Sequence, residues 1–323
     1  MSGDFIEKPQ CVAEAANAKK GLHWSLELLV FLAVFLVSQF AMAAVMMPVQ
    51  FIVLFANQEL SAAYIKAVAA NDMEALTSVS MQLASSHGYM ISALVADSIM
   101  ILMVCLFCKL IQKRKMTSLG FYKKGMVREY LIGAVVGFGI FSIAVLGSVL
   151  AGALKIEGIS TTFSIGIFLL YLLGFMIQGM AEEVVCRGYF MVSFARRYPM
   201  YLAVLANSLG FAAFHLLNSG ITVLSFVNLT LFGVFASMYF IRRGNIWGIG
   251  ALHSIWNLVQ GNFYGIRVSG MSVKNSLFTS VSVEGKELFN GGAFGLEGSI
   301  VVTLVLTAGI VILYFMKGKD RQQ

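Results

Sequence analysis

Long apolar runs separated by short polar connections make up most of the chain after residue 23. A helix rises about 1.5 Å per residue, so a run of about 20 apolar residues crosses the hydrocarbon core of a bilayer. The runs therefore predict about eight membrane-spanning helices, and the predicted fold class is an all-α polytopic membrane helix bundle. The predicted spans cover approximately residues 26–56, 89–110, 130–154, 163–195, 200–217, 221–241, 246–263 and 296–316.

The polar segments indicate how these spans are organised. Residues 1–23 mix acidic, basic and alanine residues without an apolar centre, so we expect a short cytoplasmic polar tail rather than a cleaved signal peptide. Residues 24–323 are expected to form one membrane domain, because they contain no internal repeat and no long flexible linker. The first span is long for one crossing, and we expect either a kink at Pro48 or an outer end that projects beyond the bilayer.

Composition and charge agree with a membrane location. Of the 323 residues, 59% are hydrophobic and only 12% are charged, which is typical of a multi-span membrane protein. Most of the 23 lysine and arginine residues fall in connections on the side of the two termini. Because cytoplasmic loops are enriched in these residues, we predict a plasma-membrane protein with both termini cytoplasmic and in contact with an anionic lipid leaflet. Nucleic-acid binding is not expected, since no basic surface domain is present to carry it.

One predicted span carries three ionisable side chains, within the segment 178–188 of sequence QGMAEEVVCRG. Each such group costs about 3 kcal/mol to insert into hydrocarbon, so each is expected to have a partner. Glu183 and Arg187 are four residues apart on one helix face and are predicted to form an ion pair. Glu182 lies about 100° around the helix and must face a different partner.

Two of the four histidines lie within apolar spans and can supply that partner. His215 follows the apolar residues 211–214, and His253 is followed one turn later by Asn257. Counted from the cytoplasmic ends of their spans, Glu182, His215, His253 and Asn257 lie at overlapping depths of roughly 13–24 Å. The overlap predicts a single buried polar site built from three separate helices.

The same residues form a recognisable set of motifs. In chain order these are E-E-x-x-x-R at 182–187, F-x-x-x-H at 211–215 and H-x-x-x-N at 253–257. The set resembles that of the CPBP family, which contains the Abi-like, CAAX-prenyl-protease and bacteriocin-processing membrane endopeptidases. The resemblance covers roughly residues 165–262, and it implies a protease core at about 163–263 in which Glu182 is the catalytic base.

Peptide hydrolysis needs an activated water, donors that stabilise the oxyanion and a proton donor for the leaving amine. Glu182 is the candidate base. His215 is expected to orient the water or share its proton, and His253 with Asn257 can both donate to an oxyanion. The predicted substrate is a peptide or protein at the membrane, and a bacterial plasma membrane makes prenylated substrates the less favoured choice.

Other functions of the same residues remain open. Glu183 and Arg187 are expected to give structural support rather than to take part in the chemistry. An intramembrane histidine can also serve as a simple interhelical hydrogen-bond partner. A glutamate and two histidines could bind zinc, but we expect no metal cofactor, because the chain has no H-E-x-x-H helix and Arg187 would lie beside the ion.

A non-enzymatic membrane transporter or scaffold is the alternative from another class, since buried polar clusters also bind ions and protons. Transporters often contain inverted repeats and broken helices, whereas the span at 163–195 has no proline. Asp97, in the second span, matches none of the motifs, so packing and function are both open for it. Cys105 and Cys108 have redox-like spacing but lie in an apolar span, and we expect them to pack in the protein interior.

Overall fold

Helices account for nearly all of the regular structure in the computed structural model, which describes residues 7–316. The first half contains α1 (Gln10–Ala18), α2 (Trp24–Ala56), α3 (Gln58–Ala69), α4 (Met73–Ala84), α5 (His87–Ala96), α6 (Ser98–Leu106), η1 (Phe107–Ile111), η2 (Met116–Leu119), α7 (Met126–Leu150) and β1 (Leu154–Ile159). The second half contains α8 (Ile165–Glu183), η3 (Val184–Met191), α9 (Val192–Ala195), α10 (Met200–Ala213), α11 (Val223–Arg243), α12 (Ile246–Leu258), η4 (Val259–Phe263), β2 (Phe278–Ser282), α13 (Glu287–Asn290), η5 (Gly292–Phe294), η6 (Leu296–Gly298) and α14 (Ile300–Phe315).

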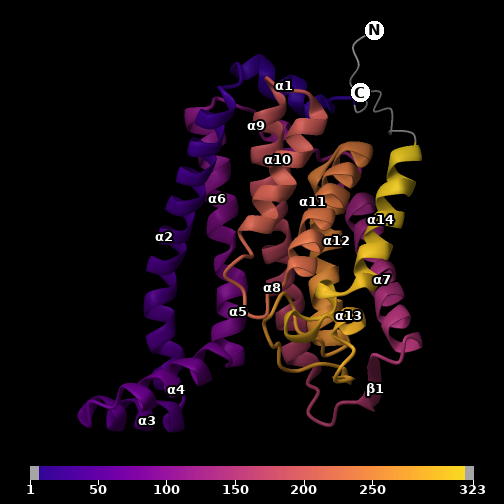
Figure 1. Ribbon diagram of the computed structural model, residues 1–323. Helices are drawn as coiled ribbons and strands as arrows, with labels where there is room; N and C mark the ends of the chain where they lie inside the picture. The colour runs from indigo at the N-terminus through magenta and orange to yellow at the C-terminus, as the bar shows by residue number, and fades with distance from the viewer. Residues whose placement is uncertain (1–6, 317–323) are drawn as a thin grey trace.

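The long helices run side by side between two ends of a bundle, and this confirms the predicted all-α polytopic membrane fold (Figure 1). Helix α1 lies at one end, here called the α1 end, whereas α3, α4 and β1 lie at the other, here called the α3–α4 end (Figure 1). Five helical segments are long and apolar enough to cross a membrane, namely Trp24–Ala56, His87–Ile111, Met126–Leu150, Ile165–Ala195 and Val223–Arg243.

The remaining predicted spans correspond to shorter helices. Helices α10 and α14 are apolar but have fewer residues, and α12 continues directly into the π-helical turn η4. Helix α10 ends at Ala213, so His215 lies in a turn after the helix. The predicted span 200–217 placed His215 inside the helix, and that prediction is wrong. The chain leaves this turn through Gly220, whose φ of +75° lies in the left-handed region that glycine favours. Helix α2 continues through Pro48 to Ala56.

The polar connection predicted at 57–88 contains two amphipathic helices, α3 and α4, which pack against each other and project sideways from the bundle (Figure 1). Both begin at side-chain caps: Asn57 Oδ1 accepts from the Leu60 amide at 3.1 Å, and Asp72 Oδ1 accepts from the Ala75 amide at 3.0 Å. Strands β1 and β2 form an antiparallel pair, which is the only sheet among residues 7–316.

The predicted polar tail also contains structure, because α1 packs against α9 and η2 at the α1 end. Its buried face consists of Cys11, Val12 and Ala15. On its polar face, Glu14 accepts hydrogen bonds from the hydroxyls of Thr117 and Tyr122. Helix α1 therefore covers the end of the span that carries the E-E-x-x-x-R motif.

That span changes its helical winding within the motif, from α-helix in α8 to π-helix in η3 immediately after Glu183. π-Helical turns leave some backbone groups without their usual partners, and they occur often at functional sites. Arg114 supplies one such partner, since its guanidinium donates to the carbonyl oxygen of Gly188 at 3.3 Å and to Ser193 Oγ at 2.9 Å.

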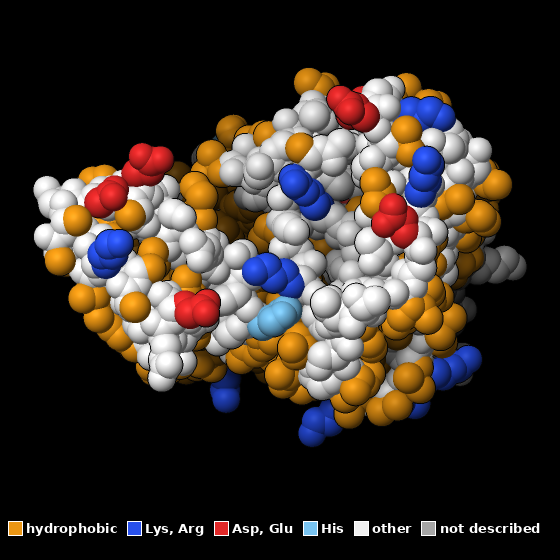
Figure 2. Space-filling model, turned by 90° about the horizontal axis from the view of Figure 1, so that it is seen from below, with side chains coloured by type: hydrophobic (Ala, Val, Ile, Leu, Met, Phe, Trp, Pro, Cys, Tyr) orange, Lys and Arg blue, Asp and Glu red, His pale blue; other side chains and the backbone are white. Residues whose placement is uncertain are grey.

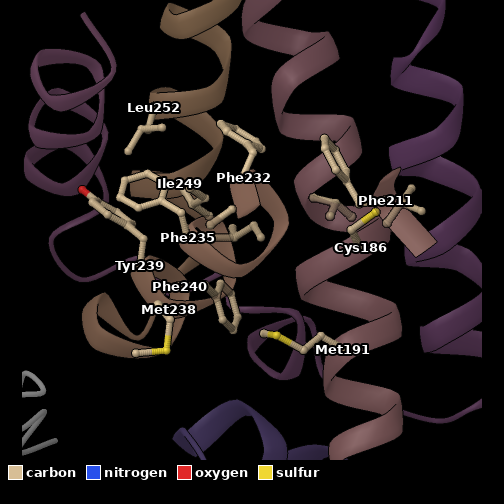
Figure 3. Close-up of a cluster of buried hydrophobic side chains, with 14 of the residues drawn as sticks. Cys186, Met191, Phe211, Phe232, Phe235, Met238, Tyr239, Phe240, Ile249 and Leu252 are labelled. Atoms are coloured by element: carbon tan, nitrogen blue, oxygen red, sulfur yellow. The ribbon is translucent and has the colours of Figure 1, made fainter. Parts of the chain in front are cut away.

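Close helix packing brings the motif helices together. A Cβ atom on Gly179 of α8 would lie 2.5 Å from the backbone nitrogen of Ser254 in α12, a distance that real Cβ atoms do not adopt. On the far side of α12, a Cβ atom on Gly133 of α7 would lie 1.9 Å from the Gly248 carbonyl oxygen. Apolar side chains from α11, including Phe232 and Phe235, fill the space beside α12 (Figure 3). Only glycine permits α12 to lie this close to both neighbours.

Candidate active site

A cavity of about 350 Å³ lies between α2, α5 and α6 on one side and α8, α10, α11 and α12 on the other. Its lining includes all four predicted catalytic residues, Glu182, His215, His253 and Asn257. These residues come from three segments separated by up to 75 positions in sequence. The structure therefore brings them together in one partly enclosed space, as the overlap of their depths predicts.

One carboxylate oxygen of Glu182 accepts a hydrogen bond, and the other has no hydrogen-bond partner. Gln178 Nε2 donates to Glu182 Oε1 at 2.5 Å, whereas Glu182 Oε2 is buried and has no hydrogen-bond partner. The nearest cationic or imidazole nitrogen is His253 Nε2, which lies 3.7 Å from Oε2. Oε2 is thus a buried acceptor whose hydrogen-bonding capacity is unused.

Gln178 had no predicted role, yet it links two of the site residues. Its Oε1 accepts a hydrogen bond from Asn257 Nδ2 at 2.9 Å while its Nε2 donates to Glu182. The one amide group thereby fixes both the carboxylate of α8 and the amide of α12. The signal in the sequence was the four-residue spacing of Gln178 and Glu182, which places both on one helix face.

Glu183 faces away from the cavity and forms the predicted pair with Arg187, whose Nη1 lies 2.9 Å from Glu183 Oε1. Both side chains are 0% exposed. The same Oε1 also lies 2.8 Å from His253 Nδ1. Because a carboxylate oxygen accepts, Nδ1 carries the proton, and His253 Nε2 is turned toward Glu182. A contact between Glu183 and His253 was not predicted.

His215 is held by a backbone contact. Its Nδ1 lies 2.9 Å from the carbonyl oxygen of Phe211. Since a carbonyl oxygen can only accept, Nδ1 donates and the Nε2 lone pair of the neutral ring stays free to accept a proton or a hydrogen bond.

Phe211, the first residue of the F-x-x-x-H motif, contacts several site residues. Its ring centroid lies 4.8 Å from that of His215 and 5.9 Å from that of His253. The Arg187 guanidinium lies over the same ring at 4.6 Å. A single aromatic ring therefore spaces the two histidines and covers the buried cation.

Among the residues that the structure describes, no lysine or arginine lines the cavity, and three side chains that line it carry carboxyl groups. They are Asp97, Glu182 and Glu297. Glu297 is held in place, because its Oε2 accepts from both the amide and the hydroxyl of Ser269 at 2.8 Å. Asp97 lies where α5 meets α6 and has no such anchoring role. Positively charged or neutral ligands suit this lining better than anions.

The donor arrangement does not assemble a metal site. Within residues 7–316, no three histidine, cysteine, aspartate or glutamate side chains are grouped so that they could hold a metal ion. The Nδ1 atoms of His215 and His253 are both used in hydrogen bonds to oxygen atoms. The Glu183 oxygen that contacts His253 is also paired with a guanidinium.

The bundle and its polar cavity define a membrane-integral protein with a buried site for chemistry. Residues 164–259 match the Rce1-like family, described as type II CAAX prenyl endopeptidases. The match begins just before α8 and ends just after α12, so it contains all three motifs. It supports the assignment of this chain to the CPBP and CAAX-protease family, and it indicates a membrane protease. No curated protein and no solved structure matches the chain.

Proposed function

We propose that this protein is an intramembrane endopeptidase that hydrolyses peptide bonds with a water molecule activated by Glu182. The observation that carries the proposal is Glu182 Oε2, which is buried without a hydrogen-bond partner and lies 3.7 Å from His253 Nε2, beside a cavity that His215 and Asn257 also line. A carboxylate held by one hydrogen bond, with its second oxygen unpartnered, is suited to general-base catalysis.

In the proposed reaction, Glu182 Oε2 takes a proton from the water while the water oxygen attacks the substrate carbonyl carbon. The free Nε2 of His215 accepts the second hydrogen bond of that water and sets the direction of attack. Negative charge then develops on the carbonyl oxygen of the tetrahedral intermediate. Glu182 finally transfers its proton to the leaving amine, and the peptide bond breaks.

Two donors serve the developing oxyanion in this proposal. Asn257 Nδ2 carries two hydrogens, and only one is needed for the bond to Gln178. The other can point into the cavity. His253 can donate through Nε2 when both ring nitrogens are protonated. Preorganised donors of this kind are worth about 2.7–4 kcal/mol each in the transition state.

Glu183 and Arg187 support this arrangement without touching the substrate. Glu183 Oε1 accepts a hydrogen bond from Nδ1 of His253, which fixes the direction of Nε2. Arg187 balances the charge of Glu183 at 2.9 Å. We propose that the mechanism uses no metal; the alternative, a zinc-dependent reaction, is tested by elemental analysis and by cleavage after exhaustive chelation.

We also propose that the protein lies in a plasma membrane with both termini in the cytoplasm. The basic residues support this orientation. At the α1 end, Arg197 and Lys124 lie in connections between helices, and Arg242 lies in the last turn of α11. The substrates are then peptide segments of membrane-associated or secreted proteins, and prenylated substrates are the less favoured choice.

Glu182→Gln tests the proposed function. The purified variant is compared with the wild type on a library of short, internally quenched peptides, and Glu74→Gln, an exposed acid on α4, is the matched control. We expect Glu182→Gln to lose cleavage by at least about 100-fold, since general-base catalysis contributes about 10²–10⁴-fold. Wild-type cleavage in Glu182→Gln would overturn the assignment of the base.

A further inference from the structure

A groove between α2 and α5 adjoins the active-site cavity. It has a volume of about 380 Å³ and shares Gln39, Met42 and Ala93 with the lining of the cavity. From these shared residues it extends along α2 to Gln50 and along α5 to Tyr89. The cavity and the groove therefore adjoin each other and share part of their lining.

The groove leads toward the α3–α4 end of the bundle. Helix α2 starts at the α1 end and finishes beside α3, so Gln50 lies closer to the α3–α4 end than Gln39 does (Figure 1). Seen from that end, the surface is hollowed between the lobe formed by α3 and α4 and the rest of the bundle (Figure 2).

In the opposite direction, aromatic side chains close the cavity. Phe35 and Phe214, which line it, are stacked with their ring centroids 4.0 Å apart. Nearer the α1 end, Phe31 and Phe190 stack at the same centroid distance and are 1% and 2% exposed. Helix α1 packs against the end of the motif span beyond this layer. A substrate arriving from the α1 end would have to displace both layers.

The groove carries groups that suit an extended peptide. Gln39 Nε2 donates to the sulfur of Met100 at 3.4 Å, and Gln50 Nε2 donates to the Tyr89 hydroxyl at a long 3.3 Å. Sulfur is a weak acceptor, and the bond of Gln50 to the Tyr89 hydroxyl is long. Both amides can therefore exchange these partners for peptide carbonyl groups at little cost in free energy. Methionines 42, 46 and 47 form the apolar wall, and their flexible side chains adapt to varied partners.

We propose that this groove, bordered by Gln39, Gln50 and Tyr89, binds an extended segment of the peptide substrate, which enters from the α3–α4 end. The proposal rests on the proposed endopeptidase function. Along α2, Gln39 and Gln50 are separated by a rise of about 16 Å. An extended chain covers about 3.3 Å per residue, so the groove holds about five substrate residues on one side of the scissile bond. With the termini in the cytoplasm, these residues come from the other side of the membrane.

Blocking the groove tests the proposal. Gln50→Cys is labelled with a maleimide that carries a polyethylene glycol chain, and Ser80→Cys, an exposed site on α4 at the same end, is the matched control. Cleavage of the internally quenched peptide library is measured before and after labelling. We expect the bulky label to lower kcat/KM at least about tenfold at Gln50→Cys and to leave it unchanged at Ser80→Cys. The labelled Gln50→Cys protein should keep the thermal unfolding midpoint of the unlabelled variant, which shows that labelling alone does not unfold it.

A second measurement tests peptide binding in the groove independently of catalysis. In the inactive Glu182→Gln background, the library peptides should slow labelling of Gln50→Cys and should not slow labelling of Ser80→Cys. Unchanged cleavage after bulky labelling of Gln50→Cys, or equal labelling rates with and without peptide, would overturn the groove. Absence of cleavage by the unmodified wild type would instead refute the endopeptidase function, while the protection measurement would still decide whether a peptide occupies the groove.

Discussion

Replacing Glu183 by glutamine leaves the Arg187 guanidinium buried without its carboxylate. Both side chains are 0% exposed, and the pair is joined at 2.9 Å. The remaining neighbours of Arg187 are the Gly233 carbonyl oxygen at 3.4 Å and the Phe211 ring at 4.6 Å, and neither carries a negative charge. Removing one member of a buried pair costs about 3–5 kcal/mol, so we expect Glu183→Gln to lower the free energy of unfolding by that amount.

The assay is unfolding in mixed detergent micelles, followed by tryptophan fluorescence. The matched control is the double variant Glu183→Gln, Arg187→Met, which removes both charges and keeps the volume. Replacing both members of a buried pair is often neutral, so the double variant should regain most of the lost stability. It should not regain cleavage, because His253 Nδ1 no longer has a carboxylate to hold it.

Two results would refute this reasoning. A free energy of unfolding for Glu183→Gln within about 1 kcal/mol of the wild type would mean that the pair contributes no more than an exposed ion pair does. Full cleavage by the double variant would mean that Glu183 does not orient His253.

Three further predictions address α1, the acidic lining and the orientation. Burial raises the pKa of the Cys11 thiol to about 12, so its reactive thiolate form is scarce at pH 8. Iodoacetamide should therefore label Cys11 at least about a thousandfold more slowly in the folded protein than after denaturation, as read by mass spectrometry. Rapid labelling of the folded chain would show that α1 is not docked. In an assay at pH 9, where the wild-type Asp97 carboxyl group is ionised, Asp97→Asn should increase, several-fold, the cleavage of library peptides with acidic residues relative to neutral ones. An unchanged ratio would remove Asp97 from substrate selection. In intact cells, an impermeant maleimide should label Ser80→Cys and not Lys124→Cys, and the reverse pattern would invert the proposed topology.

The spans and the buried ion pair were predictable from the sequence, for local physical reasons. Apolar runs of sufficient length have few alternatives to a membrane-spanning helix. The pairing of Glu183 with Arg187 follows from their spacing within one helix, and the structure forms it at 2.9 Å. The gathering of Glu182 with His215 and His253 followed from their depths, since spans of similar tilt place residues of equal depth at one level.

Other contacts depend on distances between elements, which the sequence does not encode locally. Gln178 and Asn257 are 79 residues apart, and an uncharged amide gives no signal that it needs a partner. The end of α10 before His215 is set by the turn that leads through Gly220. The docking of α1 was hidden because only Cys11, Val12 and Ala15 form its buried face, too few to register as an apolar run.

The adjacent glutamates show how one helix can serve two purposes. Consecutive residues on a helix lie about 100° apart, so Glu182 can face the cavity while Glu183 faces the protein interior. Gly179 lets α12 approach closely enough for His253 to stand between the two carboxylates, at 2.8 Å from Glu183 Oε1 and 3.7 Å from Glu182 Oε2. The Glu183 carboxylate contacts both Arg187 and His253, and it holds the imidazole in place. In the proposed mechanism, the Glu182 carboxylate, which has one unpartnered oxygen, is then the group that exchanges a proton with water. Position along the helix, rather than residue type, therefore separates the supporting glutamate from the candidate base.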